Sequence, residues 1–206
     1  MTQDIEHILR RIAEVAKGRS RVIVAIAGPP AAGKSTVSDR LAAALPDAAV
    51  LPMDGFHLDN EELEARGLLH RKGAPQTFDT DGLMALLPRI RAGEAVAVPT
   101  FDRAADRVIP AGSHIAVDTR IVLVEGNYLL LNAPYWSEMQ RYWDLTIAID
   151  VPLATLEQRL VQRWLDHGLP PDAARQRAEG NDLPNARLVL SQSVAPDVVL
   201  DQRGTG

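Results

Sequence analysis

The sequence contains no cysteine, and none of its apolar runs is long enough to cross a bilayer. Without cysteine there are no disulfides, thiolate nucleophiles or cysteine metal ligands, so catalysis must use oxygen and nitrogen groups. The first residues also lack the apolar core of a signal peptide, because charged residues such as Asp4, Glu6 and Arg10 stand there. These absences predict a cytoplasmic protein without membrane insertion.

Excess positive charge is missing as well. The net charge of −5 over 206 residues argues against a broad grip on a phosphate backbone, so we expect no nucleic-acid partner. The nearest basic patch, residues 70–72, is typical of a solvated loop. The histidines show no metal-ligand spacing, so we expect no transition metal. The sequence leaves the oligomeric state open, with a homodimer as one alternative.

Short apolar runs alternate with helical patterns along the chain, and no linker or repeat marks a second domain. This alternation predicts a single α/β domain, residues 1–206, with a mainly parallel sheet. We expect strands at 21–27, 48–53, 120–124, 144–149 and 198–200. We expect the main helices at 3–17, 37–44, 81–92 and 152–167. Pro88 should kink or shorten the third of them.

Residues 28–35, Gly-Pro-Pro-Ala-Ala-Gly-Lys-Ser, match the phosphate-loop pattern G-x-x-x-x-G-K-[ST] between an expected strand and an expected helix. Glycines let backbone amides converge on phosphate oxygens, and the helix start adds its positive end. Lys34 is one of only three lysines against nineteen arginines, and we expect it on the β and γ phosphates. The predicted nucleotide-binding residues are Gly28, Ala31, Ala32, Gly33, Lys34, Ser35 and Thr36.

The expected cofactors are ATP and Mg²⁺. The Ser35 hydroxyl is expected to coordinate the metal ion, as the corresponding residue does in this loop pattern. The sequence has no Asn-Lys-x-Asp segment for reading guanine, which favours ATP over GTP as the donor.

Three carboxylates follow expected strands: Asp54, Glu125 and Asp150. Ligands bind beyond the carboxyl ends of parallel strands, so these side chains are candidates for chemistry. Asp54 is the candidate general base for an acceptor hydroxyl, with a helix cap or turn residue as the alternative. Glu125 is the candidate acid of the magnesium shell. Asp150 precedes Pro152, where a capping role explains it.

Arg159 and Arg163 stand four residues apart and should project from one side of the late helix. One interpretation is a lid that neutralises charge on the transferring phosphoryl group. The other is a solvated helix face on which the arginines pair with Glu157 or Asp166. Spacing alone leaves both open.

Several further segments resemble the P-loop kinases of the uridine kinase, phosphoribulokinase and pantothenate kinase superfamily. They are Met53-Asp54-Gly-Phe-His57, Thr77-Phe78-Asp79, Pro99-Thr-Phe101-Asp102-Arg103 and Glu125-Gly-Asn-Tyr128. The resemblance implies a three-layer P-loop NTPase fold with a helical lid at about 152–180. It implies catalytic roles for Lys34, Asp54, Arg159 and Arg163, and a metal role for Glu125. The implied substrate residues are Asp54, His57, Phe78, Asp79, Phe101 and Tyr128.

Within this superfamily, residues 71–79 and 181–185 look most like bacterial proteins described as fructose transport system kinases or nucleoside-kinase-like proteins. Phe101 replaces the usual tyrosine, and the histidine expected after it is missing, which argues against pyrimidine recognition. The expected function is therefore ATP-dependent phosphorylation of a hydroxyl on a sugar or similar polyol, such as fructose. A nucleoside or pantothenate kinase and a nucleotide-gated regulatory ATP-binding protein are the alternatives.

Overall fold

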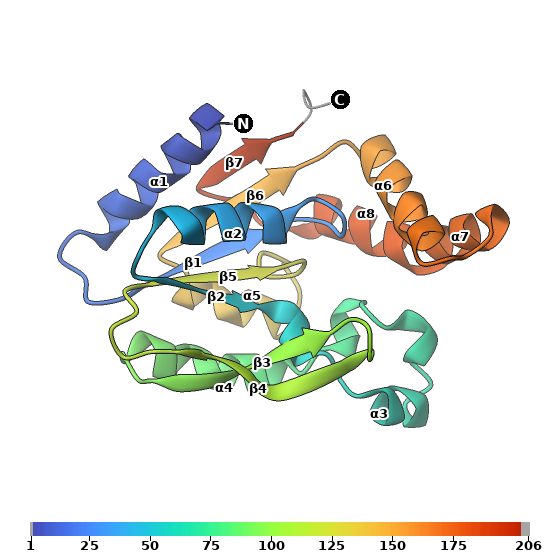
Figure 1. The fold of residues 1–206 in the computed structure, drawn as a ribbon, viewed down its shortest axis with the longest axis horizontal. Coiled ribbons are helices and arrows are strands. Elements are labelled where there is room, and N and C mark those ends of the chain that lie inside the picture. Colours follow the sequence, from blue (N-terminus) through green and yellow to red (C-terminus); the bar gives the residue numbers. More distant parts are fainter. Residues whose placement is uncertain (1, 203–206) are drawn as a thin grey trace.

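The computed structural model describes residues 2–202, and its main sheet has five parallel strands in the order β2-β5-β1-β6-β7 (Figure 1). The strands are β1 (Val22–Ala27), β2 (Ala48–Pro52), β5 (Ile121–Gly126), β6 (Leu145–Asp150) and β7 (Val198–Asp201). The five runs that the sequence predicted as strands are thus confirmed.

The register of the sheet places the ends of three strands together. Ala27 of β1 lies opposite Gly126 of β5, and Glu125 lies opposite Pro52 of β2. The segments that follow these strands therefore leave the sheet at the same edge, as parallel pairing requires.

Helices cover both faces of the sheet, which confirms the predicted α/β/α layers. Along β1 the side chains alternate between two cores: Ile23 and Ala25 face one, and Val24 and Ile26 face the other. The first core contains residues from α4 (Thr80–Arg91), α5 (Trp136–Met139) and α8 (Leu183–Gln192). The second contains residues from α1 (Thr2–Ala16) and α2 (Lys34–Ala44), on the opposite side of the sheet (Figure 1).

Helix α4 runs through Pro88 to Arg91, so the expected shortening of this helix is wrong. Proline removes one backbone hydrogen bond and crowds the preceding turn. Leu83, Leu87 and Ile90 are nevertheless all fully buried in the core on both sides of the proline. Burial of these side chains outweighs the local cost and holds the helix together.

A two-stranded antiparallel sheet, β3 (Val96–Asp102) and β4 (Arg107–Ile115), was not predicted. It packs against the short 3₁₀ turn η1 (Met53–Phe56) that follows β2. The approach is close, because a Cβ atom added to Gly55 would lie 2.2 Å from the carbonyl oxygen of Pro99. The hairpin thereby extends beside the segment that carries Asp54.

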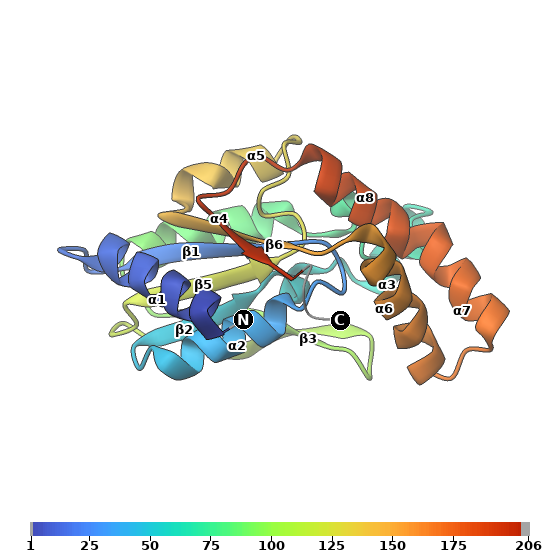
Figure 2. The same ribbon diagram turned by 90° about the horizontal axis from the view of Figure 1, so that it is seen from above.

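The remaining helices lie at the end of the molecule toward which the parallel strands point (Figure 2). They are α6 (Leu153–Asp166), α7 (Pro171–Arg177) and the π-helical turn η5 (Ala178–Asp182), which leads into α8. Leu160, Ala178 and Leu183 form a small core of their own there. The connection after η1 contains α3 (Asn60–Ala65), η2 (Leu69–Arg71) and η3 (Pro75–Thr77), and η4 (Gln140–Tyr142) follows α5. Among residues 2–202, no helix has the length and apolarity needed to span a membrane.

Arg21 precedes β1 at the opposite end from the phosphate loop and is only 4% exposed. Its guanidinium group donates to five backbone carbonyls, those of Ile90, Glu94, Ala116, Val117 and Thr119. These carbonyls belong to the ends of three segments, so one side chain joins α4 to the segments around β4 and β5.

Candidate functional site

The loop between β1 and α2 has the backbone of an anion-binding loop. Gly33 has φ 87° and is the N-cap of α2, where no side chain forms a capping hydrogen bond. Ala31 also has a positive φ, 64°. Gly28 sits tightly against β6, because an added Cβ would lie 3.2 Å from the carbonyl oxygen of Ile149. The N-terminus of α2 is thus left for a ligand with negative charge.

Lys34 opens α2 and is held under the loop. Its Nζ atom donates to Oδ1 of Asn127 at 2.6 Å and to the carbonyl oxygen of Pro29 at 3.1 Å. Burial lowers the pKa of Lys34, while the nearby carboxylates of Glu125 and Asp54 act in the opposite direction. The sequence analysis missed Asn127, although it lies two residues after Glu125.

Ser35 and Glu125 meet at the base of the same loop. The Ser35 hydroxyl donates to Oε1 of Glu125 at 2.9 Å, and Glu125 is 7% exposed. Burial raises the pKa of Glu125, and the positive charge of Lys34 opposes this shift. A hydroxyl and a carboxylate in contact supply the oxygen ligands that Mg²⁺ prefers, so these residues fit the expected cation.

These groups line a cavity of about 900 Å³ at the carboxyl edge of the sheet. Of the predicted nucleotide-binding residues, Ala31, Gly33, Lys34, Ser35 and Thr36 line it. Gly28 and Ala32 do not; Ala32 is fully buried and supports the loop from behind.

Asp54 lines the same cavity from η1. Its Oδ2 atom accepts from Nη2 of Arg103 at 2.6 Å, and Arg103 reaches it from the end of β3 across the close η1 contact. Sequence analysis placed Arg103 in a segment that resembles the kinase superfamily but gave this residue no role. No local pattern indicates this pair, because the two residues are 49 positions apart.

Three of the predicted substrate residues form one wall of the cavity. The ring of His57 lies 4.2 Å from that of Phe78 and 4.6 Å from that of Phe101, measured between centroids. Nδ1 of His57 is 2.8 Å from the carbonyl oxygen of Asp54. Burial lowers the pKa of His57, which leaves the ring neutral at pH 7.

The structure does not bring Asp79 or Tyr128 to the cavity surface. Asp79 is exposed and caps α4, accepting from the amide of Gly82 at 2.8 Å. Tyr128 is fully buried behind the wall, its ring 5.8 Å from that of Phe78, and its hydroxyl donates to the carbonyl of Gly73. Burial raises the pKa of Tyr128.

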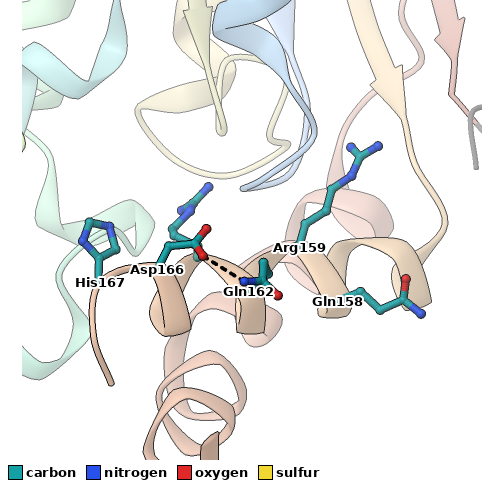
Figure 3. Close-up of a pocket in the computed structure, with 6 residues that line it drawn as sticks. Gln158, Arg159, Gln162, Asp166 and His167 are labelled. Atoms are coloured by element: carbon teal, nitrogen blue, oxygen red, sulfur yellow. Dashed lines mark hydrogen bonds between the residues drawn. The ribbon is translucent and has the colours of Figure 1, made fainter. Parts of the chain in front are cut away.

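Arg159 and Arg163 line the cavity from α6. Arg159 extends toward the phosphate loop, where its Nη1 atom donates to the carbonyl oxygen of Ala31 at 3.2 Å (Figure 3). Burial lowers the pKa of Arg163, and the carboxylate of Asp182 opposes this. Within residues 2–202, no ion pair joins either arginine to Glu157 or Asp166, which was the alternative interpretation.

A second hollow of about 560 Å³ runs along α6 and shares Arg159, Arg163 and His167 with the main cavity (Figure 3). In its lining, the side-chain amide of Gln162 donates to Oδ1 of Asp166, four residues later on α6, at 2.8 Å. It contains no residue of the phosphate loop and neither Asp54 nor Glu125. We therefore place the chemistry in the larger cavity.

The segments 71–79 and 181–185, noted in the sequence as features of one subgroup, meet in the structure. The Asn181 side chain donates to the carbonyl oxygen of Lys72 at 2.8 Å, and Arg71 donates to the carbonyl oxygen of Gly180 at 3.1 Å. The π-helical turn is also tied to α6, since the indole of Trp164 donates to Asp182 at 2.6 Å. The helices at this end are therefore attached to the wall of the cavity.

The family model described as "Phosphoribulokinase / Uridine kinase family" matches residues 23–165 of the chain. A provisionally assigned uridine kinase of Schizosaccharomyces pombe is 34% identical over 215 residues, which cover 96% of this chain and 90% of the relative. Pantothenate kinase of Rhodococcus erythropolis is 30% identical over 150 residues, 69% of this chain, and the match spans about half of that enzyme, 48%.

Among solved structures, a provisionally assigned fructose transport system kinase from Silicibacter sp. TM1040 is 47% identical, with a TM-score of 0.92. The match covers 95% of this chain and 98% of that one. The family match spans the residues of the phosphate loop together with Asp54 and Glu125. The chain is a P-loop phosphotransferase that belongs to the phosphoribulokinase/uridine kinase family.

Proposed function

We propose that this chain transfers the γ-phosphoryl group of ATP to a hydroxyl of a sugar or similar polyol, with fructose as the first candidate. The observation that carries the proposal is the position of Asp54, which lines the same cavity as Lys34, Ser35 and Glu125. A carboxylate beside the phosphate loop is what an in-line transfer to an alcohol requires.

In the proposed mechanism, the amides of the loop and the ammonium of Lys34 bind the phosphates of the nucleotide. Ser35 and Glu125 would hold Mg²⁺, which would supply positive charge to neutralise the phosphate oxygens. Arg159 and Arg163 neutralise the remaining charge from α6. The helices at about 152–180 act as a lid that excludes water from the cavity.

Asp54 accepts the proton of the acceptor hydroxyl as the new oxygen–phosphorus bond forms, while the bond between the γ-phosphorus and the β,γ-bridging oxygen breaks and ADP is the leaving group. Arg103 keeps the carboxylate oriented until the acceptor arrives. His57, Phe78 and Phe101 form the wall against which the acceptor lies. Asp79 and Tyr128 act behind this wall, Asp79 by capping α4 and Tyr128 by fixing the ring of Phe78 and the carbonyl of Gly73.

The choice of fructose rests on the 47% identity to the Silicibacter protein. Nucleosides and pantothenate remain alternatives through the Schizosaccharomyces and Rhodococcus relatives. A regulatory ATP-binding protein, acting from the cytoplasm, would need the phosphate loop but no base, so the role of Asp54 separates the two classes.

The test is Asp54→Asn in a coupled ADP-release assay with sugars, nucleosides and pantothenate as acceptors. We expect acceptor-dependent turnover in the wild type and a fall of about 10²-fold or more in the variant, with the nucleotide Kd retained. Asp59→Asn is the matched control, since Asp59 is exposed and caps no amide of α3. Equal turnover in Asp54→Asn and wild type would refute the assigned base, and a wild type that no acceptor stimulates would refute the kinase proposal.

A further inference from the structure

Two ion pairs line the part of the cavity that is formed by η1, the loop that carries Lys72 and the β3–β4 turn. Arg103 is paired with Asp54 at 2.6 Å, and Lys72 is paired with Asp106 at 2.8 Å. All four side chains line the cavity. This region, which we call the acceptor half, therefore has two positive and two negative charges.

Lys72 has no hydrogen-bond donor left for a ligand. An ammonium group has three donors, and here they have three acceptors: Oδ1 of Asn60 at 2.6 Å, Oδ1 of Asp106 at 2.8 Å and the carbonyl oxygen of Asp106 at 3.1 Å. The Lys72 side chain is only 11% exposed, and Nζ lies 4.9 Å from the centroid of the Phe101 ring. A carboxylate or phosphate entering the acceptor half would have to displace one of these partners.

The lining of the whole cavity has a net positive charge, and the nucleotide is the ligand placed to neutralise it. Six lysine and arginine side chains line it, against four carboxylates. Of the cations outside the two pairs, Lys34, Arg159 and Arg163 face the phosphate end. The last, Arg177, lies over the indole of Trp164 at 5.1 Å and donates to the carbonyl oxygen of His70. The magnesium complex of a nucleoside triphosphate carries about two negative charges, which equals the excess.

The side chains of His57 and Asp54 offer hydrogen-bond acceptors to a ligand in this part of the cavity. Because a carbonyl oxygen can only accept, Nδ1 of His57 donates to Asp54, and Nε2 of the neutral ring is left as an acceptor. The carboxylate of Asp54 adds further acceptor atoms. Hydroxyl groups donate to such atoms, whereas a carboxylate or phosphate cannot.

From this arrangement we infer that the phosphoryl acceptor is an uncharged polyhydroxyl compound, and that acceptors carrying a carboxylate or phosphate are rejected. The inference rests on the proposed kinase function and narrows it. It excludes pantothenate and sugar phosphates among the alternatives and keeps sugars and nucleosides. An anionic acceptor would lie beside the carboxylates of Asp54 and Asp106, whose cations are already paired with them. Its binding free energy would therefore be less favourable than that of an uncharged acceptor.

The experiment compares acceptors that differ only in charge. The pairs are D-pantothenyl alcohol against D-pantothenate, and D-fructose against D-fructose 6-phosphate, each with saturating ATP and Mg²⁺. In every pair of which either member is turned over, we expect kcat/KM for the uncharged member to exceed that of the anionic member by about tenfold or more. An anionic member used as well as or better than its uncharged partner overturns the inference but leaves the kinase proposal standing. If none of the tested acceptors, nucleosides included, stimulates turnover, the proposed function is refuted and the inference with it.

Asp106→Asn tests whether the Lys72–Asp106 ion pair causes the preference for uncharged acceptors. Asp106 has φ 49°, a conformation that asparagine tolerates, so the turn is preserved while Lys72 loses its counter-charge. We expect the preference for uncharged acceptors to shrink by about threefold to tenfold. Glu62→Gln is the matched control, because it removes the charged partner of Arg66 at the end of α3, outside the cavity, and should leave the preference unchanged. An equal preference in Asp106→Asn and wild type, with unfolding curves that superimpose, would overturn the assignment.

Discussion

Replacement of Arg21 by lysine tests whether this one buried side chain holds α4 together with the segments around β4 and β5, at the end of the molecule remote from the cavity. Arginine donates there to five carbonyls spread over three segments. Lysine keeps the charge, but its ammonium has three donors at a single point, so at least two carbonyls lose their partner. Four of the five hydrogen bonds are only partly buried, so each lost bond costs about 0.5–1.5 kcal/mol, and we expect the free energy of unfolding to fall by about 1–3 kcal/mol.

Urea denaturation followed by far-UV circular dichroism measures this change. Arg120→Lys is the matched control, because Arg120 is 55% exposed and makes one long contact with Asp47 at 3.5 Å. Loss of this contact should lower the free energy of unfolding by about 0–1 kcal/mol. If Arg21→Lys and Arg120→Lys unfold with the same free energy, the carbonyl contacts of Arg21 contribute nothing and the reasoning fails. Turnover per folded molecule should be unchanged, since Arg21 lies at the other end of β1.

Three further changes address the cavity. Lys34→Arg should lower turnover by about 10²-fold or more in the ADP-release assay, because a planar guanidinium does not fit between Asn127 and Pro29. Gly28→Ala should lower the free energy of unfolding by about 1–3 kcal/mol in urea denaturation, because the new Cβ meets the carbonyl oxygen of Ile149. Burial lowers the pKa of His57 in the folded state, so the unfolded chain takes up the proton first as the pH falls below about 6.5. Stability is therefore lost on acidification, and His57→Gln should show a weaker loss in denaturation curves between about pH 7.5 and pH 5.5; parallel curves would contradict this.

The sheet and the phosphate loop were predictable because their signals are local. A strand buried on both faces appears as a continuous apolar run, and residues 22–27 are all buried. The loop pattern combines two glycines with Lys34 and Ser35 between such a run and a helix. In both cases the residues that define the element are consecutive.

The β3–β4 hairpin was missed because its signals are contradictory. Pro99 stands inside β3, where proline normally argues against a strand. The register shifts between Val98 and Thr100, so the proline occupies an irregularity of the ladder and removes no regular pairing. Gly112 in the facing strand gives room to Thr100, whose Oγ1 would lie 1.9 Å from an added Cβ.

The partners of the site residues were unpredictable for a different reason. Asp54 meets Arg103 only because Gly55 allows η1 to pack on β3, and β3 itself was not foreseen. Asp79 and Tyr128 stand in segments that resemble substrate-binding motifs, but the backbone turns them to a helix cap and to the core. A motif gives the residue types, and the tertiary structure decides which of them reach the cavity.

The bond between the Asn181 side chain and the carbonyl oxygen of Lys72 joins η5 to the loop that carries Lys72. Under the proposed function the helices around η5 belong to a lid, and an outward movement of this lid that lets ADP leave would pull on that loop. A sugar resting against that loop resists the pull. Exit of the nucleotide should therefore be slower while the second substrate is in place, which sets an order for the release of products.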